Sequence, residues 1–159
     1  MIEIERKFLL KGVPDLKPDE VIKIKQWYLK VDGIWERARS MESNISGIKW
    51  VHTVKTRVSD ISNIEEEIDL SKYEFDSFVK ECKKSNGRYI TKERRIYLDS
   101  DLKWEVDIFS NKCHMIVAEV EIPTEDYDLI IPEFIEKKSL LEVSGLKQFS
   151  NRSLSSRIK

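Results

Sequence analysis

The sequence predicts an α+β protein that consists mainly of antiparallel strands. Apolar and polar residues alternate with a period of two through most of the chain, which is typical of strands with one buried face. Short turn signals such as Val31-Asp32-Gly33 and Ser85-Asn86-Gly87 separate the segments, and connections of this length join antiparallel neighbours. The alternation predicts eight strands, over residues 2–10, 20–30, 33–40, 49–57, 63–70, 88–98, 102–109 and 115–123.

One clear helix is expected to interrupt the strands, over residues 71–84. Ser71 can cap its N-terminus, Glu74 completes a capping box, and the apolar residues that follow recur at helical spacing. A second helix is predicted to begin at Pro132. The Ser-rich tail from Ser150 onward is predicted to be polar and frayed.

The length and composition limit the classes of protein to consider. The 159 residues fit a single domain over residues 1–159. The 28 basic and 29 acidic residues nearly cancel, which argues against binding nucleic acid through bulk positive charge. No apolar run approaches the roughly 18 residues of a membrane span, and Cys82 and Cys113 lack metal-ligand spacing. We therefore expect a cytoplasmic protein with reduced thiols and no nucleic-acid or membrane partner.

Charged side chains are sorted by sign along the predicted strands. Glu3, Glu5 and Lys7 share one face of the first strand, because alternate residues of a strand point the same way. On one strand this pattern is ordinary, but solvated faces normally mix both signs, whereas the later strands keep them apart. The acidic pairs are Glu65 and Glu67, Glu105 and Asp107, and Glu119 and Glu121, and the basic pairs are Arg37 and Arg39, Lys55 and Arg57, and Lys92 and Arg94.

These pairs favour a barrel whose charged faces turn inward while helices and loops cover the apolar faces. Buried charges are unfavourable unless they are paired, so such an interior must hold water, metal and ligand. Carboxylates suit Mg²⁺ or Mn²⁺, and arginine and lysine suit phosphate oxygens. The residues therefore indicate a metal-dependent site for a polyphosphate.

The same residues resemble the signature of the CYTH superfamily, the triphosphate tunnel metalloenzymes. Glu3-Ile4-Glu5-Arg6-Lys7 matches the ExExK motif of that family. The charged pairs follow in the family's order as far as Ala118-Glu119-Val120-Glu121, so the resemblance spans nearly the whole chain and is strongest to small bacterial triphosphatases. It implies an eight-stranded antiparallel tunnel with a charged interior and a few covering helices.

The resemblance also implies roles for individual residues in binding and turnover. Lys7 is similar to a catalytic lysine near the scissile phosphate, and Tyr28, within Gln26-Trp27-Tyr28-Leu29, resembles the tyrosine of the family's Gln-Gly-Tyr-Leu segment. The implied triphosphate clamp consists of Lys7, Arg37, Arg39, Lys55, Lys92, Arg94 and Lys147.

The implied cofactor is a pair of divalent ions, Mg²⁺ or Mn²⁺, held by carboxylates directly or through water. The candidate ligands are Glu3, Glu5, Glu65, Glu67, Asp107, Glu119 and Glu121.

The predicted activity is metal-dependent hydrolysis of a terminal phosphoryl group of inorganic tripolyphosphate, a nucleoside triphosphate or a similar triphosphate. A class IV-type adenylate cyclase and a thiamine triphosphatase would use the same tunnel, and a non-catalytic polyphosphate-binding module would need the basic clamp alone. The short chain carries no obvious base-binding insertion, which favours tripolyphosphate or a nucleoside triphosphate. Some members of the family are homodimers, and the oligomeric state of this chain is left open.

Overall fold

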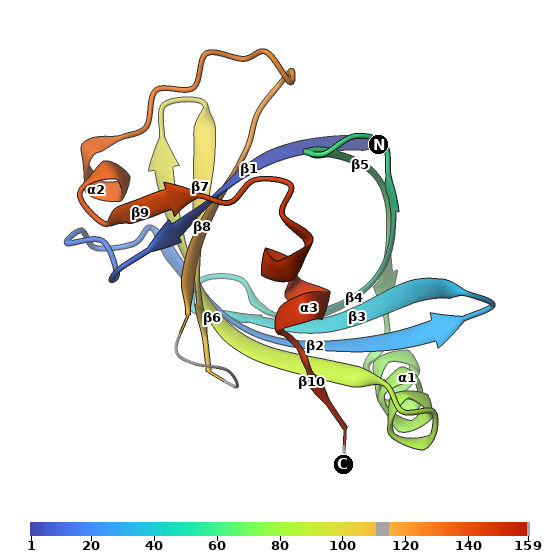
Figure 1. Cartoon of the computed structure of the whole chain (residues 1–159). Helices are drawn as coiled ribbons and strands as arrows, with labels where there is room; N and C mark the ends of the chain where they lie inside the picture. The colour runs from blue at the N-terminus through green and yellow to red at the C-terminus, as the bar shows by residue number, and fades with distance from the viewer. Residues whose placement is uncertain (111–114, 159) are drawn as a thin grey trace.

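The computed structural model describes residues 1–110 and 115–158, and these form a closed antiparallel barrel (Figure 1). The barrel strands are β1 (Ile2–Leu10), β2 (Glu20–Val31), β3 (Ile34–Ser43), β4 (Gly47–Arg57), β5 (Ser62–Leu70), β6 (Arg88–Asp99), β7 (Leu102–Phe109) and β8 (Ile116–Glu121). They pair in the order β6-β2-β3-β4-β5-β1-β8-β7, and β7 pairs with β6 to close the wall. The predicted fold class is confirmed, and each predicted strand is present with bounds that shift by at most three residues.

The pairing register places oppositely charged residues from neighbouring strands beside one another. Lys7 of β1 lies opposite Glu119 of β8, and Lys55 of β4 lies opposite Glu65 of β5. The Lys7 Nζ is 3.3 Å from a Glu119 carboxylate oxygen, and the Lys55 Nζ is 2.9 Å from Glu3. The alternating charged residues of these strands therefore face a common interior.

The predicted first helix is present as α1 (Lys72–Lys84). Ser71 accepts from the backbone N–H of Glu74, and the Glu74 carboxylate accepts from the backbone N–H of Ser71, so the expected capping box is formed. The helix lies outside the barrel and packs against strands β2 to β5 (Figure 1). Its buried residues, Phe75 and Cys82, cover part of the outer apolar surface of the sheet.

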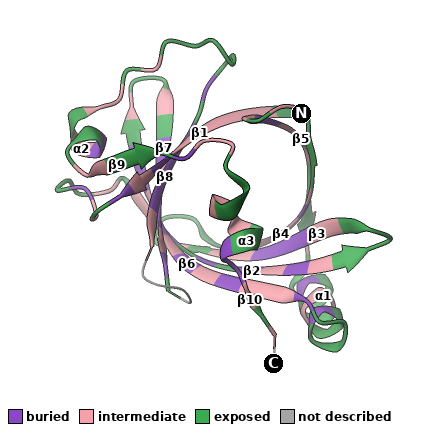
Figure 2. Cartoon of the chain, viewed as in Figure 1, coloured by how far each residue is buried: buried purple, intermediate pink, exposed green. Residues whose placement is uncertain are grey.

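The largest apolar core also lies outside the barrel wall. Phe8, Trp104 and Val120 on the outward faces of β1, β7 and β8 pack together in it. The predicted second helix is present as the single turn α2 (Glu133–Glu136), whose Ile135 is fully buried in this core. Figure 2 shows buried residues on β8 and in α2. Covering the wall from outside leaves the interior free for polar side chains.

Apolar side chains nevertheless occupy part of the barrel interior. Ile22, Ile24 and Ile96 form one cluster. A second cluster contains Tyr28, Ile90, Phe109, Val117 and Leu154. The sequence pattern predicted inward apolar residues only at Ile90 and Ile96 of β6, whereas the two clusters also contain residues of β2, β7, β8 and the C-terminal segment.

The C-terminal segment runs from the outside of the barrel across its opening (Figure 1). Its elements are β9 (Ser139–Glu142), which pairs with β1, η1 (Lys147–Phe149), α3 (Asn151–Leu154) and β10 (Ser156–Arg157), which pairs with β6. The prediction of a frayed tail is wrong: Leu154 is buried against the second interior cluster, and Ser155 is fully buried. One apolar anchor and the Ser150 cap of α3 hold an otherwise polar segment in place.

Two further expectations concern the thiols and the membrane. Cys82 is a free, buried cysteine, and burial raises the pKa of its thiol to about 12, whereas Cys113 lies outside the described residues. None of the helices in the described part of the chain has the length and apolar character that crossing a bilayer requires.

Candidate functional site

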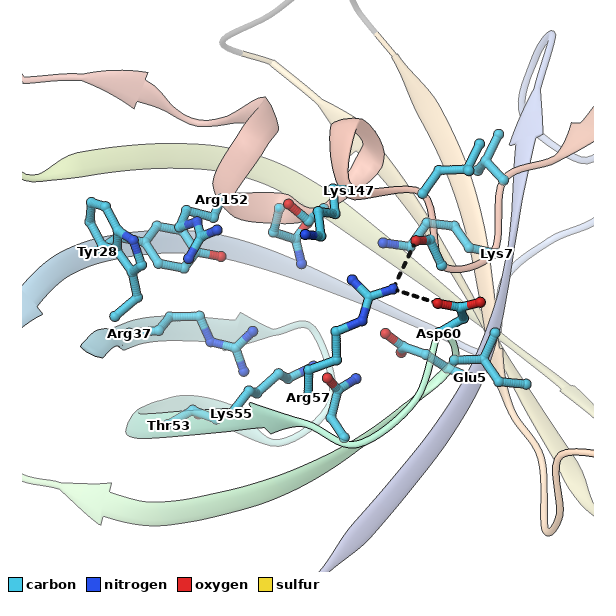
Figure 3. Close-up of a pocket in the computed structure, with 18 residues that line it drawn as sticks. Glu5, Lys7, Tyr28, Arg37, Thr53, Lys55, Arg57, Asp60, Lys147 and Arg152 are labelled. Carbon is cyan, nitrogen blue, oxygen red and sulfur yellow. Dashed lines mark hydrogen bonds and ion pairs between the residues drawn. The ribbon is translucent and has the colours of Figure 1, made fainter. Parts of the chain in front are cut away.

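A cavity of about 370 Å³ lies inside the barrel, between strands β1 to β5 and the C-terminal segment. This volume falls within the range of about 300–1,000 Å³ that is usual for small-molecule sites. Figure 3 shows the side chains that surround it. Its cationic lining residues are Lys7, Arg37, Lys55, Arg57, Lys147 and Arg152, against the two carboxylates Glu5 and Asp60. The cavity wall is therefore strongly positive although the whole chain is nearly neutral.

Glu5 and Glu119 form a carboxyl pair beside Lys7. Burial raises the pKa of Glu5 to about 8, and the neighbouring negative charge of Glu119 adds to the rise. Burial also opposes ionisation of Glu119, but Lys7, Lys92 and Arg94 outweigh it and hold the pKa of Glu119 well below its usual range. At neutral pH the pair therefore carries one proton, which the two carboxyl groups share in a hydrogen bond.

Glu3 and Glu65 form a second carboxyl pair, which holds the ammonium group of Lys55. The Lys55 Nζ lies 2.9 Å from Glu3 and 3.3 Å from Glu65. Burial raises the pKa of Glu3 to about 7, against the opposing charge of Lys55. Burial acts on Glu65 in the same direction, but its hydrogen bond with Glu3 and the charge of Lys55 lower its pKa to about 2. This pair holds one proton below about pH 7 and loses it as the pH rises further.

The two carboxyl pairs are a suitable donor set for a divalent cation. Carboxylate oxygens are the ligands that Mg²⁺ and Mn²⁺ prefer. The described residues contain no group of three or more His, Cys, Asp or Glu arranged around one point. Mg²⁺, however, commonly takes only one or two carboxylates and fills its remaining positions with water and substrate phosphates. The residues therefore fit a cation whose coordination the substrate completes.

Three predicted site residues lie together in a buried ion network that does not line the cavity. Asp107 accepts from Lys92 at 2.7 Å and from Arg94 Nε at 2.8 Å, and Arg94 also donates to Glu105 at 2.9 Å. Arg94 and Lys92 outweigh the effect of burial and lower the pKa of Asp107. In this arrangement the charge and the hydrogen-bonding groups of Asp107 are satisfied by Lys92 and Arg94, beside the cavity wall.

The remaining predicted residues differ in how close they lie to the cavity. Tyr28 lines it, and its hydroxyl accepts a hydrogen bond from the Gln26 amide at 3.0 Å. Lys147 lines the cavity from η1. Arg39 is buried and donates to Glu67 at 3.0 Å. Glu121 ends β8, where it is exposed and lies outside the cavity lining.

Arg57, Asp60 and Arg152 line the cavity although none of them belongs to the implied triphosphate clamp or to the candidate metal ligands. The alternation placed Arg57 on the same strand face as Lys55, as the structure shows, but the family resemblance gave it no role of its own. Its guanidinium donates to Asp60 and to the carbonyl of Gly145, both at 3.2 Å, and these contacts are drawn in Figure 3. Arg152 belongs to a segment without strand periodicity, so no pattern in the sequence pointed to it.

Solved structures show what this barrel is similar to. The PH1012 protein from Pyrococcus horikoshii OT3 is 18% identical, with a TM-score of 0.56 over 85% of this chain and 84% of that one. The PH1819 protein from the same organism is 15% identical, with a TM-score of 0.55 over 85% of each chain. A conserved hypothetical protein from Pyrococcus furiosus is 15% identical, with a TM-score of 0.53 over 85% and 84%. This chain shares their fold.

At these identities the likeness establishes the fold alone. No protein-family model matches the sequence, and no curated protein matches it. The closed antiparallel barrel is nevertheless the architecture that the resemblance to the CYTH superfamily implies, so the two lines of observation are consistent with each other.

Proposed function

We propose that this chain is a divalent-metal-dependent triphosphatase of the CYTH type, which hydrolyses a terminal phosphoryl group of tripolyphosphate or a nucleoside triphosphate. The observation that carries the proposal is the charge of the interior cavity, where six cationic side chains face only two carboxylates. A cavity with this lining favours a small, highly charged anion. The carboxyl pairs beside the cavity can bind divalent ions together with the phosphates of such an anion.

In this proposal the cations bind and orient the substrate. Arg37 offers its planar guanidinium to phosphate oxygens, while Lys7 and Lys55 act as point charges beside the two carboxyl pairs. Fixed positive groups stabilise the charge that develops on a transferred phosphoryl group without reorganising. Gln26 donates to the Tyr28 hydroxyl, and in this proposal the Tyr28 O–H in turn donates to a substrate oxygen.

The proposed metal ligands are Glu5 with Glu119 and Glu3 with Glu65. A bound Mg²⁺ or Mn²⁺ polarises phosphate oxygens and lowers the pKa of a coordinated water. The side chains of the two pairs must lose their shared protons to accept it, which makes metal affinity rise with pH.

The decisive experiment incubates the purified protein with tripolyphosphate, ATP or thiamine triphosphate, with Mg²⁺, Mn²⁺ or a chelator. Free phosphate, pyrophosphate and cyclic nucleotide are then separated. We expect metal-dependent phosphate release. Cyclic nucleotide with pyrophosphate would instead identify a cyclase, and tight binding without turnover would identify a binding module.

A pair of variants connects that activity to the site. Glu119→Gln is expected to lower turnover at least about a hundredfold, because it replaces the negatively charged carboxylate of a proposed metal ligand beside Lys7 with a neutral amide. Glu93→Gln is the matched control, since Glu93 lies on the outer face of β6, where it pairs with Arg95. Both variants must keep the circular dichroism spectrum of the wild type. Full activity in Glu119→Gln would refute the assignment.

A further inference from the structure

Strand β5 extends beyond the part that β1 covers. β1 pairs with β5 over three residues only, ending with Ile2 opposite Ile64. One contact continues the ladder, because the backbone N–H of Glu65 donates to the Met1 carbonyl at 2.9 Å. Over residues 66–70, β5 pairs with β4 on one side, and on its other side it has no strand partner among the described residues. This stretch, which we call the free edge, lies at one end of the barrel wall, and Figure 2 shows most of it as exposed.

Backbone groups along the free edge face away from β4. Successive residues of a strand direct their N–H and C=O groups to opposite sides. Glu65 directs both groups toward Met1, with which it makes contacts of 2.9 Å and 3.4 Å. Glu67 and Asp69 therefore direct theirs toward the same side, where the described residues supply no partner strand. A row of such groups is a template on which a further extended chain can add.

The side chains of the free edge are mostly acidic. Glu66, Glu67 and Asp69 are exposed, and residues 62–70 contain no lysine or arginine. Glu67 pairs with Arg39 at 3.0 Å, but Glu66 and Asp69 have no ion-pair partner among the described residues. A chain that pairs with this edge must therefore bring positive charge, since like charges directly opposite each other destabilise a sheet.

The outer face beside the free edge carries exposed apolar side chains. Ile68 is 60% exposed, and Ile64 and Ile2, which lie opposite each other on β5 and β1, are 41% and 61% exposed. Because alternate residues of a strand share a face, Ile68 and Ile64 point outward, while Glu67 and Asp69 point inward. A strand added at the edge would therefore bury the Ile68 side chain if its own outward residues are apolar.

The charges of the free edge disfavour a second copy of this chain as the occupant. The backbone groups that face the free side belong to Glu67 and Asp69, so antiparallel pairing of two such edges sets these residues opposite each other or opposite themselves. Each of these registers places carboxylates directly opposite carboxylates. Charge complementarity therefore selects a basic partner.

We propose that the free edge of β5 is a docking site for a basic, extended segment of another protein. The segment adds as a strand antiparallel to β5, in line with β1. Its lysine or arginine residues lie opposite Glu67 and Asp69, and an apolar residue between them packs against Ile68. The inference is independent of the proposed triphosphatase activity, because none of these three residues lines the interior cavity.

The probe is a synthetic peptide of alternating lysine and valine, capped at both ends. Isothermal titration compares it with two matched peptides. One carries N-methyl groups on the backbone nitrogens of its lysines, which keeps the charge but blocks backbone pairing, and the other has glutamate in place of lysine. We expect each change to weaken binding at least about tenfold. Equal affinity of the N-methylated peptide would overturn the proposal, because the peptide would then be held by charge alone.

Amide hydrogen exchange, followed by NMR, locates the bound peptide on the wild type. The backbone N–H groups of Glu67 and Asp69 should exchange at least about tenfold more slowly with the lysine peptide bound, whereas those of Glu66 and Ile68, which face β4, should change little. Unchanged exchange at Glu67 and Asp69 would refute docking at this edge. If both groups are protected without peptide and lose that protection on dilution, a second copy occupies the edge and the proposal is refuted.

A pair of variants tests the charge of the edge. Asp69→Lys is compared with Asp101→Lys, because Asp101, in the turn between β6 and β7, is also exposed and without an ion-pair partner among the described residues. Both variants must keep the circular dichroism spectrum of the wild type. We expect Asp69→Lys to weaken the lysine peptide at least about tenfold and Asp101→Lys to change its affinity less than about twofold. Equal affinities in the two variants would overturn the proposal.

Discussion

Asp107 and Arg94 form a two-point ion pair inside the barrel wall. The Arg94 Nε and Nη2 donate to the two Asp107 oxygens at 2.8 Å and 2.9 Å, and the Asp107 side chain is fully buried. Lys92 adds a third contact at 2.7 Å. The family resemblance implies that Asp107 binds metal and that Arg94 and Lys92 bind phosphate, and those roles stay predictions. In the structure, these contacts join the three side chains to one another.

Asp107→Asn should therefore destabilise the metal-free protein. The substitution leaves Lys92 without the carboxylate it contacts and Arg94 with Glu105 alone, and removing one partner of a buried pair typically costs about 3 to 5 kcal/mol. Urea unfolding in a chelator measures the loss. Glu93→Gln, which removes the carboxylate of a pair with Arg95 whose two partners are both partly exposed, should cost no more than about 1 kcal/mol. If Asp107→Asn keeps full stability and loses only the response to metal, Asp107 acts as a ligand instead.

The carboxyl pairs predict how the stability of the metal-free protein depends on pH. The pKa of Glu5 is raised to about 8 and that of Glu3 to about 7, from 4.5 in the unfolded chain. Between these values the folded state binds more protons than the unfolded state, so the free energy of unfolding falls as pH rises from about 5 to about 8. The lowered pKa of Glu65, about 2, acts only in acid, where its stabilising effect is lost as pH falls below 4.5.

Glu5→Gln tests this pH dependence, because the amide stays neutral at every pH. The variant should lose part of the decline in stability that the wild type shows above about pH 5. Urea midpoints across that range provide the measurement, and Glu93→Gln on the outer face serves as the control. A decline in Glu5→Gln as steep as that of the wild type would show that Glu5 ionises without a penalty.

The inward faces could be predicted because strand periodicity and charge sign are both local properties. Glu3, Glu5 and Lys7 alternate along one strand, and no distant information is needed to see it. The partners could not be predicted in this way. Whether Lys92 faces a ligand or Asp107 depends on the register between β6 and β7, which is set by the closure of the whole barrel. Arg152 reaches the cavity only because Leu154 anchors the C-terminal segment inside the barrel.

Gly145 provides a test of that C-terminal segment. Its φ of +72° favours glycine, and a Cβ at this position would lie 2.6 Å from the Asp60 carbonyl oxygen. Gly145→Ala should destabilise the protein by about 1 to 3 kcal/mol and should weaken substrate binding, because Gly145 joins the segment to Arg57. Gly33→Ala has a similar φ of +81° but meets nothing within 4 Å, so it isolates the backbone strain at about 1 kcal/mol. Equal losses in the two variants would show that the contact with Asp60 contributes nothing.

Arg37 and Arg39 allow a comparison of a binding arginine with a structural one on the same strand. Both are buried, at 7% and 8% exposure, but only Arg39 has a carboxylate partner, Glu67 at 3.0 Å. Arg37→Met removes a buried charge without an acidic partner, so the stability of the ligand-free protein should stay the same or rise. Tripolyphosphate affinity should fall at least about tenfold, since a charge-assisted contact to phosphate is lost.

Arg39→Met should behave in the opposite way. It leaves Glu67 without its cation, and because Glu67 is partly exposed we expect a loss of about 1 to 2 kcal/mol in the free energy of unfolding. Arg37→Lys completes the series: it keeps the charge but not the planar fork, so it should restore part of the affinity and none of the two-point contact. A fall in stability for Arg37→Met as large as that for Arg39→Met would mean that Arg37 supports the fold, and the cavity would then lack the guanidinium that the proposed substrate site requires.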